Sequence, residues 1–269
     1  MFVPGRFYRS PLDLSTPFER SGSAISQTPP ARHPEQLLRA DRQRLTCEWA
    51  WRELSLIFCI SGGLLLGLVI LAGIGSPLWL IPAAPVLALG GFLIAFFRNP
   101  RRSPPRGPGL IVSPADGTVT DIERVEEAEF LHAPAVRIGI FLSLFNVHVN
   151  RAPARGTVEW LRRRQGVFHD ARSEAARAEN ESQDIGIVRD DDGGPAGVRL
   201  LVRQIAGAIA RRIICPLEQG MPLDRGGLIG MIKFGSRTEL YIPESSGAEV
   251  LVGVGSRVKG GTSVLAVFR

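Results

Sequence analysis

The sequence predicts a mainly β protein of the α+β class, in which a β-rich domain follows a transmembrane helical hairpin. Residues 54–97 contain no charged side chain, which is unusual for a water-soluble chain. After them, short apolar runs alternate with glycine, a pattern typical of β-rich domains. With 45% hydrophobic and 22% charged residues, the 269-residue chain is neither disordered nor collagen-like.

Residues 1–53 are predicted to form a flexible basic extension. Most of this segment is rich in Ser, Pro and Arg, a composition that supplies little apolar surface for a packed core. The apolar run after it starts too late and is too long for a cleaved signal peptide, so none is expected.

The predicted hairpin occupies residues 54–97, about twice the roughly 20 residues that one helical crossing needs. The tripeptide Gly75-Ser76-Pro77 breaks the run near its middle, so the expected arms are Leu54–Ile74 and Leu78–Phe97. Two further prolines near the start of the second arm leave a shallow re-entrant dip as the alternative to a full crossing.

Arginines flank the hairpin on both sides. Arg39, Arg42, Arg44 and Arg52 precede it, and Arg98, Arg101, Arg102 and Arg106 follow it. By the positive-inside rule both flanks face the cytoplasm, so the domain of residues 98–269 is expected on the cytoplasmic side of the cell (inner) membrane. The four arginines after the run either fix this topology only or also attract an anionic lipid surface.

The β-rich domain begins after a stiff, proline-rich basic segment, residues 98–106. Its predicted strands are Leu110–Val112, Gly117–Ile122, Val136–Leu142, Val198–Ile205, Leu228–Phe234, Thr238–Ile242, Ala248–Val254 and Val264–Phe268. Residues 171–181 are expected to be a short helix or an ordered polar loop, and residues 190–194 a turn and not a calcium loop.

The composition narrows the possible chemistry. Only two lysines, Lys233 and Lys259, could hold a lysine-bound cofactor such as pyridoxal phosphate. Three widely spaced cysteines, Cys47, Cys59 and Cys215, fit neither a disulfide scaffold nor a zinc site, so no metal is expected. The formal net charge of +6 identifies no partner by itself, and a nucleic acid is not expected.

Two segments that each contain a glycine turn, residues 113–119 and 254–262, resemble the two halves of a lipoyl- or biotinyl-type β-barrel. Lys259 in the second segment lacks the methionine neighbours of a biotin carrier. We therefore expect lipoyl-like barrel elements without a swinging arm.

Residues 231–240 predict a strand, a turn at Gly235-Ser236 and a second strand. Such a pair is usually an ordinary turn. A serine hydroxyl can nevertheless attack the carbonyl of a preceding glycine, which offers little steric hindrance and tolerates a strained backbone. β-Elimination of the resulting ester leaves dehydroalanine, which hydrolyses to a pyruvoyl group.

Further segments give this pair a context. They are Phe-Phe-Arg-Asn-Pro at 96–100, Ser-Pro-Ala-Asp-Gly at 113–117, Phe-Leu-Ser-Leu-Phe-Asn-Val-His-Val-Asn-Arg at 141–151 and Phe-Gly-Ser-Arg at 234–237, with support from 179–181 and 203–212. In this order and spacing, roughly residues 55–269 resemble the short, prokaryotic (type A) phosphatidylserine decarboxylases, which are pyruvoyl-dependent.

The resemblance implies self-cleavage between Gly235 and Ser236 into a large chain, residues 1–235, and a small chain, residues 236–269. The two chains would stay together as a heterodimer, with a higher oligomer left open. Ser236 would become a covalent pyruvoyl group, the expected cofactor, and form a Schiff base with phosphatidylserine in the membrane. Loss of carbon dioxide would then give phosphatidylethanolamine, a step of phospholipid biosynthesis.

His148 is the preferred acid–base group, because it follows a predicted strand within a resembling segment. The other histidines, His33, His132 and His169, lie in the extension or in polar stretches. Asp116 resembles the family carboxylate that assists self-cleavage by orienting the imidazole. Relatives of the longer type have a second histidine where this chain has Arg151, a poor base. Either His148 serves both reactions or Arg151 contributes electrostatically.

Two alternative functions remain open at this point. A non-enzymatic, membrane-anchored lipoyl-like carrier or adaptor would remain a single chain of 29.2 kDa. A pyruvoyl decarboxylase for a soluble amino acid would have little use for a membrane hairpin. The second Gly-Ser-Arg, at 255–257, lacks the flanking residues of the first, and we expect no catalytic role for Ser256.

Overall fold

The computed structural model describes residues 48–171, 173–190, 194–208, 212–233 and 236–268. The predicted extension up to residue 47, most of the predicted turn at 190–194, and Gly235 lie outside the described residues.

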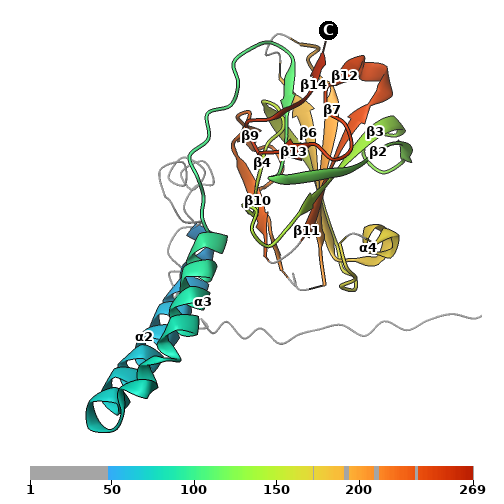
Figure 1. Ribbon diagram of the computed structural model, residues 1–269. Coiled ribbons are helices and arrows are strands. Elements are labelled where there is room, and N and C mark those ends of the chain that lie inside the picture. The colour runs from blue at the N-terminus through green and yellow to red at the C-terminus, as the bar shows by residue number, and fades with distance from the viewer. Residues whose placement is uncertain (1–47, 172, 191–193, 209–211, 234–235, 269) are drawn as a thin grey trace, which may run out of the picture. The chain divides into compact units, whose positions relative to one another are not determined.

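The predicted helical hairpin is confirmed as two helices joined by a short turn (Figure 1). A 3-10 turn, η1 (Glu48–Ala50), leads into α2 (Trp51–Ile74), and η2 (Pro77–Leu80) leads into α3 (Ala83–Phe96). The break lies where glycine and proline predict it, since α2 ends at Gly75 and Ser76 caps η2 by accepting a hydrogen bond from the Leu78 amide.

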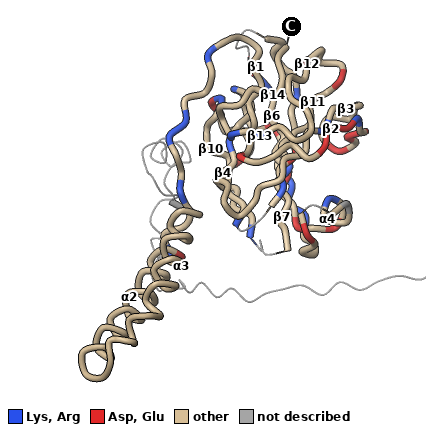
Figure 2. Tube along the Cα trace, in the orientation of Figure 1, with Lys and Arg blue, Asp and Glu red and all other residues tan. Residues whose placement is uncertain are grey.

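Both arms are long and apolar enough to cross a membrane. At about 1.5 Å per residue, a helix of 24 residues such as α2 spans roughly 36 Å, against a hydrocarbon core of about 30 Å. Figure 2 shows the two helices almost free of charge and basic residues along the chain that follows them. Apolar side chains such as Phe58 and Leu66, each 62% exposed, supply the surface that lipid would cover. These features support association with a membrane.

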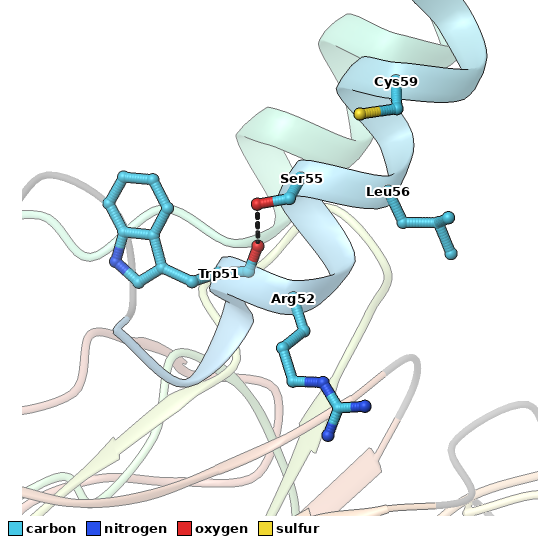
Figure 3. Close-up of a pocket in the computed structure, with 5 residues that line it drawn as sticks. All are labelled: Trp51, Arg52, Ser55, Leu56 and Cys59. Atoms are coloured by element: carbon cyan, nitrogen blue, oxygen red, sulfur yellow. Dashed lines mark hydrogen bonds between the residues drawn. The ribbon is translucent and has the colours of Figure 1, made fainter.

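The outer surface of α2 near its first turn is an open, mostly apolar depression (Figure 3). Trp51 lies there, half exposed, and its carbonyl accepts a 2.7 Å hydrogen bond from the Ser55 hydroxyl. Tryptophan prefers the headgroup level of a bilayer, and Arg52 beside it can reach the aqueous side. This end of α2 therefore suits the membrane–water interface.

The β domain contains a large antiparallel sheet in the order β13-β2-β3-β11-β7-β6-β5-β9. Its strands are β2 (Gly117–Glu127), β3 (Ala133–Leu142), β5 (Gly156–Arg164), β6 (Ser182–Arg189), β7 (Arg199–Ala206), β9 (Pro222–Leu223), β11 (Ser236–Pro243) and β13 (Arg257–Val258). Two three-stranded sheets, β1-β14-β12 and β4-β10-β8, complete the domain. They consist of β1 (Leu110–Val112), β4 (Val149–Arg151), β8 (Ile213–Ile214), β10 (Leu228–Ile232), β12 (Ala248–Val250) and β14 (Val264–Phe268).

The two predicted barrel halves, residues 113–119 and 254–262, pair with each other. Thr118 of β2 lies opposite Arg257 of β13, and the Gly261 amide donates to the Ser113 carbonyl at 2.8 Å. The chain ends of the β domain are thus joined into one curled, barrel-like element, as the sequence predicts.

β11 lies in the centre of the large sheet, paired with β3 on one side and β7 on the other (Figure 1). Residues such as Leu240 and Ile242 face a buried apolar core, in which Ile138 and Ile140 of β3 also lie. The alternate residues, beginning with Arg237, face a cluster of ion pairs under the short helix α4 (Glu174–Glu179). The helix confirms one of the two structures expected for residues 171–181.

Candidate functional site

Ser236 is the first residue of β11, and it is completely buried. It lies between Leu142 of β3 and Ala206 of β7 in the sheet register. Its Oγ has no hydrogen-bond partner among the described residues. A buried hydroxyl of this kind is unusual, because burial without a partner destabilises a polar group.

An unpartnered hydroxyl suits a serine that is to be consumed. No hydrogen bond among the described residues has to break before Ser236 Oγ rotates toward the preceding carbonyl. The completely buried position also keeps bulk water away from an ester or a ketone formed there. The surroundings of Ser236 therefore fit a pyruvoyl group derived from it.

His148 lies beside the chain that leads into Ser236. Its carbonyl accepts a hydrogen bond from the Ile232 amide, four residues before Ser236. Two residues after His148, Asn150 donates to Thr238 Oγ1 at 3.0 Å and accepts from Gln204 at 2.7 Å. Thr238 shares a sheet face with Ser236, because side chains two residues apart in a strand point the same way. These contacts bring the His148 segment against the Ser236 face of β11.

The imidazole of His148 is completely buried, and burial lowers its pKa from 6.5 to about 4. The positive charge of Arg98 acts in the same direction, while the 3.0 Å contact of Nδ1 with the Asn146 carbonyl opposes it. The ring of Phe96, at the end of α3, lies 4.3 Å from the imidazole between centroids. His148 is therefore neutral at physiological pH and can act as a base.

Asp116 precedes β2 at the same edge of the sheet as Ser236. Thr118 of β2 pairs with Phe141 of β3, and Ser236 pairs with Leu142, so β3 alone separates them. Neighbouring strands lie about 4.8 Å apart, so β2 and β11 lie about 10 Å apart across β3. The Asp116 carboxylate accepts hydrogen bonds from Arg102 and from the Gly260 amide, each at 2.7 Å. Its expected action on the imidazole of His148 stays a prediction.

Arg151 is buried and ties the segment after the hairpin to the β domain. It donates to the Asn99 side chain at 2.7 Å and to the carbonyls of Pro100 and Gly226. Beside it opens a groove of about 510 Å³, which Arg101, Arg102 and Arg225 also line. These contacts favour a structural role for Arg151 over direct help to the reaction.

Arg237, next to Ser236, anchors the start of β11 from the opposite sheet face. Its guanidinium donates to Asp121, Thr120 and Glu239 at 2.7–2.8 Å. Burial acts to raise the pKa of Asp121, but the bonds from Arg237 and Thr120 outweigh it and leave that pKa below its ordinary value. A β-carbon at Gly139 would lie 1.9 Å from Arg237 Nη2, so only glycine leaves room for this arginine.

The base of the hairpin packs against the part of the β domain that contains His148. A cluster of buried apolar residues joins Ala50, Leu54, Phe96 and Phe97 of the hairpin to Val147, Val149, Leu228 and Met231 of the β domain. Arg98 adds a 2.7 Å hydrogen bond to the Phe145 carbonyl, in the loop before His148. The helical hairpin is thus in direct contact with β4, which follows His148, and with β10, which precedes the chain leading to Ser236.

Sequence reasoning identified the individual motifs but missed how they support one another. Asn150 lies inside a motif that the sequence had singled out, yet its link to Thr238 and Gln204 depends on strand pairing far apart in the chain. Phe96 also lies inside such a motif, yet nothing in the local sequence indicates that its ring meets His148, 52 positions further along the chain.

An apolar hairpin joined to an antiparallel β domain, with a buried serine and a neutral histidine, is the architecture expected of an enzyme associated with a membrane. Residues 89–266 match the family model described as phosphatidylserine decarboxylase. The chain belongs to this family.

Curated relatives agree with the family match over most of their length. The chain is 48% identical over 174 residues, 65% of its own length and 78% of the relative, to a phosphatidylserine decarboxylase proenzyme of Carboxydothermus hydrogenoformans. It is 47% identical over 209 residues to the proenzyme of Trichlorobacter lovleyi, covering 78% and 88% of the two chains. A third, from Rhodopirellula baltica, is 41% identical over 201 residues, with 75% and 82% covered.

Proposed function

We propose that this protein decarboxylates phosphatidylserine to phosphatidylethanolamine after cleaving its own backbone between Gly235 and Ser236. The observation that carries the proposal is the buried, unpartnered Ser236 hydroxyl at the start of a central strand, within a chain of the phosphatidylserine decarboxylase family. The proenzyme names of its relatives support the cleavage step.

In the proposed cleavage, Ser236 Oγ forms a bond to the Gly235 carbonyl carbon, and the amide C–N bond breaks. His148, neutral at physiological pH, takes the hydroxyl proton, and the departing amine receives a proton. An ester then joins the two residues. Loss of the Ser236 α-proton breaks its Cβ–Oγ bond and frees the Gly235 carboxylate. Addition of water and loss of ammonia leave a pyruvoyl group at position 236.

A pyruvoyl group supplies a ketone that a substrate amine can join and an amide carbonyl that accepts the electron pair left by carbon dioxide. The residues around position 236 would transfer protons and hold the reacting groups in place. His148 is the group best suited to return a proton to the substrate α-carbon, because its segment contacts both the chain leading into Ser236 and the Ser236 face of β11. Arg237 would keep β11 in place through its bonds to Asp121 and Glu239.

The substrate is a membrane lipid, and the contacts at the hairpin base suit one. Phe145, 76% exposed in the loop before His148, contacts Phe92 of α3 with 5.9 Å between ring centroids. Phe92 lies about one helical turn, roughly 5 Å, inside the end of α3. The loop before the candidate base would therefore dip to headgroup depth. In the groove beside Arg151, the exposed Arg101 offers positive charge for an anionic headgroup, whereas Arg102 is paired with Asp116.

The proposed organisation has three parts: a basic extension (1–53), a membrane hairpin (54–97) and a cytoplasmic decarboxylase domain (98–269) at the inner membrane. The large and small chains would remain one heterodimer, because β11 starts the small chain and is paired on both sides with strands of the large one. Of the four arginines after the hairpin, Arg98 and Arg102 are bonded within the protein, so Arg101 and Arg106 are better placed to meet lipid.

The test uses the full chain purified in detergent and mixed with phosphatidylserine vesicles. We expect release of carbon dioxide with formation of phosphatidylethanolamine, and loss of both after treatment with hydroxylamine, which traps ketones. Free serine should not react. A single uncleaved chain without activity would overturn the proposal in favour of a carrier or adaptor.

A further inference from the structure

We infer that an ion pair between Lys233 and Glu53 couples the membrane hairpin to self-cleavage, by fixing the backbone that leads into the Gly235-Ser236 bond. The inference rests on the proposed cleavage. It makes Lys233 and Glu53 positioning residues, which act through the backbone and not on the reacting atoms.

The pair joins the first turn of α2 to the end of β10. Lys233 Nζ donates to Glu53 Oε1, and the Lys233 side chain is only 7% exposed. The ring of Phe97 lies 5.8 Å from the same ammonium group. Lysine is rarely buried without a partner, and the Glu53 side chain, which is 35% exposed, supplies that partner from the edge of the contact. Removing Glu53 would leave the buried ammonium group without its carboxylate. Glu53 is thus needed to keep Lys233 where it lies.

The Lys233 backbone is held as well as its side chain. Its amide donates to the Arg212 carbonyl at 3.2 Å, one residue after the Ile232 amide bonds to the His148 carbonyl. From Lys233 the chain reaches Ser236 in three Cα–Cα steps, at most about 11 Å. Ser236 is itself fixed between β3 and β7. Only residues 234 and 235 separate Lys233 from Ser236. We therefore expect a shift of Lys233 to reach the bond proposed to break.

The ion pair is not what holds the hairpin to the domain. The apolar cluster of Ala50, Leu54, Phe96 and Phe97 against β4 and β10 remains when the charges are removed. We therefore expect variants of the pair to fold and insert, but with Lys233 displaced relative to Ser236. Misplacement by about 1 Å can slow a reaction by about 100-fold. Contact with the hairpin would in this way set the rate of maturation.

The experiment follows conversion of newly made full-length chain to large and small chains on denaturing gels, in the presence of vesicles. Lys233→Met and Glu53→Gln should each slow conversion at least about tenfold. Lys233→Arg, which keeps the charge, and the reversed pair Glu53→Lys with Lys233→Glu should recover most of the rate. Lys259→Met, at the only other lysine, and Arg52→Gln, beside Glu53, serve as matched controls and should mature like the parent.

The inference is overturned if Lys233→Met matures at the parent rate, or if the reversed pair is as slow as the single variants. Rates are compared only among variants that insert to the same extent as the parent, so that recovery in the reversed pair reports positioning and not a repaired folding defect. Ser236→Ala, run in parallel, separates the two proposals. If it stays intact while Lys233→Met matures normally, only the coupling fails; if it is cleaved, the proposed cleavage fails.

Discussion

The chain contains the tripeptide Gly-Ser-Arg twice, and the two copies lie in very different surroundings. Ser236 is buried at the start of a central strand with an unpartnered hydroxyl. Ser256 lies in a turn before the edge strand β13, and its hydroxyl accepts a 3.2 Å hydrogen bond from the Gly253 amide. Gly255 has a φ of 88° with nothing near a would-be β-carbon, as in an ordinary open turn.

The arginines differ in the same way. Arg237 is 2% exposed and is bonded to Asp121, Thr120 and Glu239, whereas Arg257 is exposed on β13. The contrast teaches that a reactive Gly-Ser pair is defined by what fixes and buries it. The three letters of the motif do not distinguish the two copies.

The largest expected difference between the copies is in cleavage. Ser236→Ala removes the attacking oxygen, so the chain should remain full length and inactive. Ser256→Ala should be cleaved and active like the parent, because that hydroxyl serves only its turn. Denaturing gels and decarboxylation assays measure both. Normal cleavage of the Ser236 variant would remove the distinction between the two copies.

A second prediction concerns the acid–base groups proposed to act at Ser236. His148→Ala should slow maturation by about 100-fold or more, and Asp116→Ala by a similar factor if the carboxylate assists the imidazole. His169→Ala is the matched control, since that exposed imidazole contacts Glu179 and should be dispensable. Normal maturation without decarboxylation in His148→Ala would restrict this histidine to the second reaction.

The arginines should differ in stability. Replacing Arg237 by alanine removes the shortest ion pairs of Asp121 and Glu239. The two carboxylates then keep charged partners only at 3.4–3.9 Å, and the free energy of unfolding should fall by about 3 kcal/mol. Arg257→Ala should change it by less than about 0.5 kcal/mol. Both are best measured by denaturant unfolding in micelles, in the uncleavable Ser236→Ala background. Equal losses would mean that the buried network does not anchor β11.

The smallest expected effect is a shift in pH dependence. With the pKa of His148 at about 4, maturation of the parent should hold its rate to well below neutrality. Phe96→Ala admits water, so the pKa should rise toward the ordinary 6.5 and the rate should fall several-fold near pH 5.5, with little change at pH 8. Phe92→Ala, one turn earlier on α3, is the control. An unshifted profile in Phe96→Ala would show that this ring does not exclude water from the imidazole.

The lowered pKa of His148 also makes the free energy of unfolding depend on pH. Between pH 6.5 and about 4 the unfolded chain binds a proton at His148 that the folded chain does not. The free energy of unfolding should therefore decrease as the pH falls through this window.

The sequence predicted the hairpin, its break and most apolar strands, because periodicity and glycine or proline punctuation are local signals. It missed the short strands β4, β8, β9 and β13, and it continued the strand from Ala248 to Val254, whereas β12 ends at Val250. It also missed the longer β5 and β6, and it ended β2 at residue 122 instead of 127. These strands carry many charged residues, whose partners come from neighbouring strands, as when Arg203 pairs with Asp184 at 2.6 Å.

The residues of the candidate site also fall into those that local motifs predict and those that depend on tertiary contacts. Ser236, His148 and Asp116 stood out because they lie in recognisable motifs. The Lys233–Glu53 pair joins positions 180 residues apart, and a single sequence gives no indication that they meet. Tertiary pairing of this kind decides which of two identical tripeptides is buried, and it cannot be derived from local pattern alone.

The central claim is that the chain breaks at Gly235-Ser236 and converts Ser236 into a pyruvoyl group. Intact-mass spectrometry of the purified polypeptides tests it directly. The account predicts a small chain of residues 236–269 that is lighter than the encoded fragment by one ammonia molecule and gains two hydrogens on borohydride reduction. An uncleaved chain, a small chain that begins with an unmodified serine, or a fragment that begins at residue 256 would contradict it.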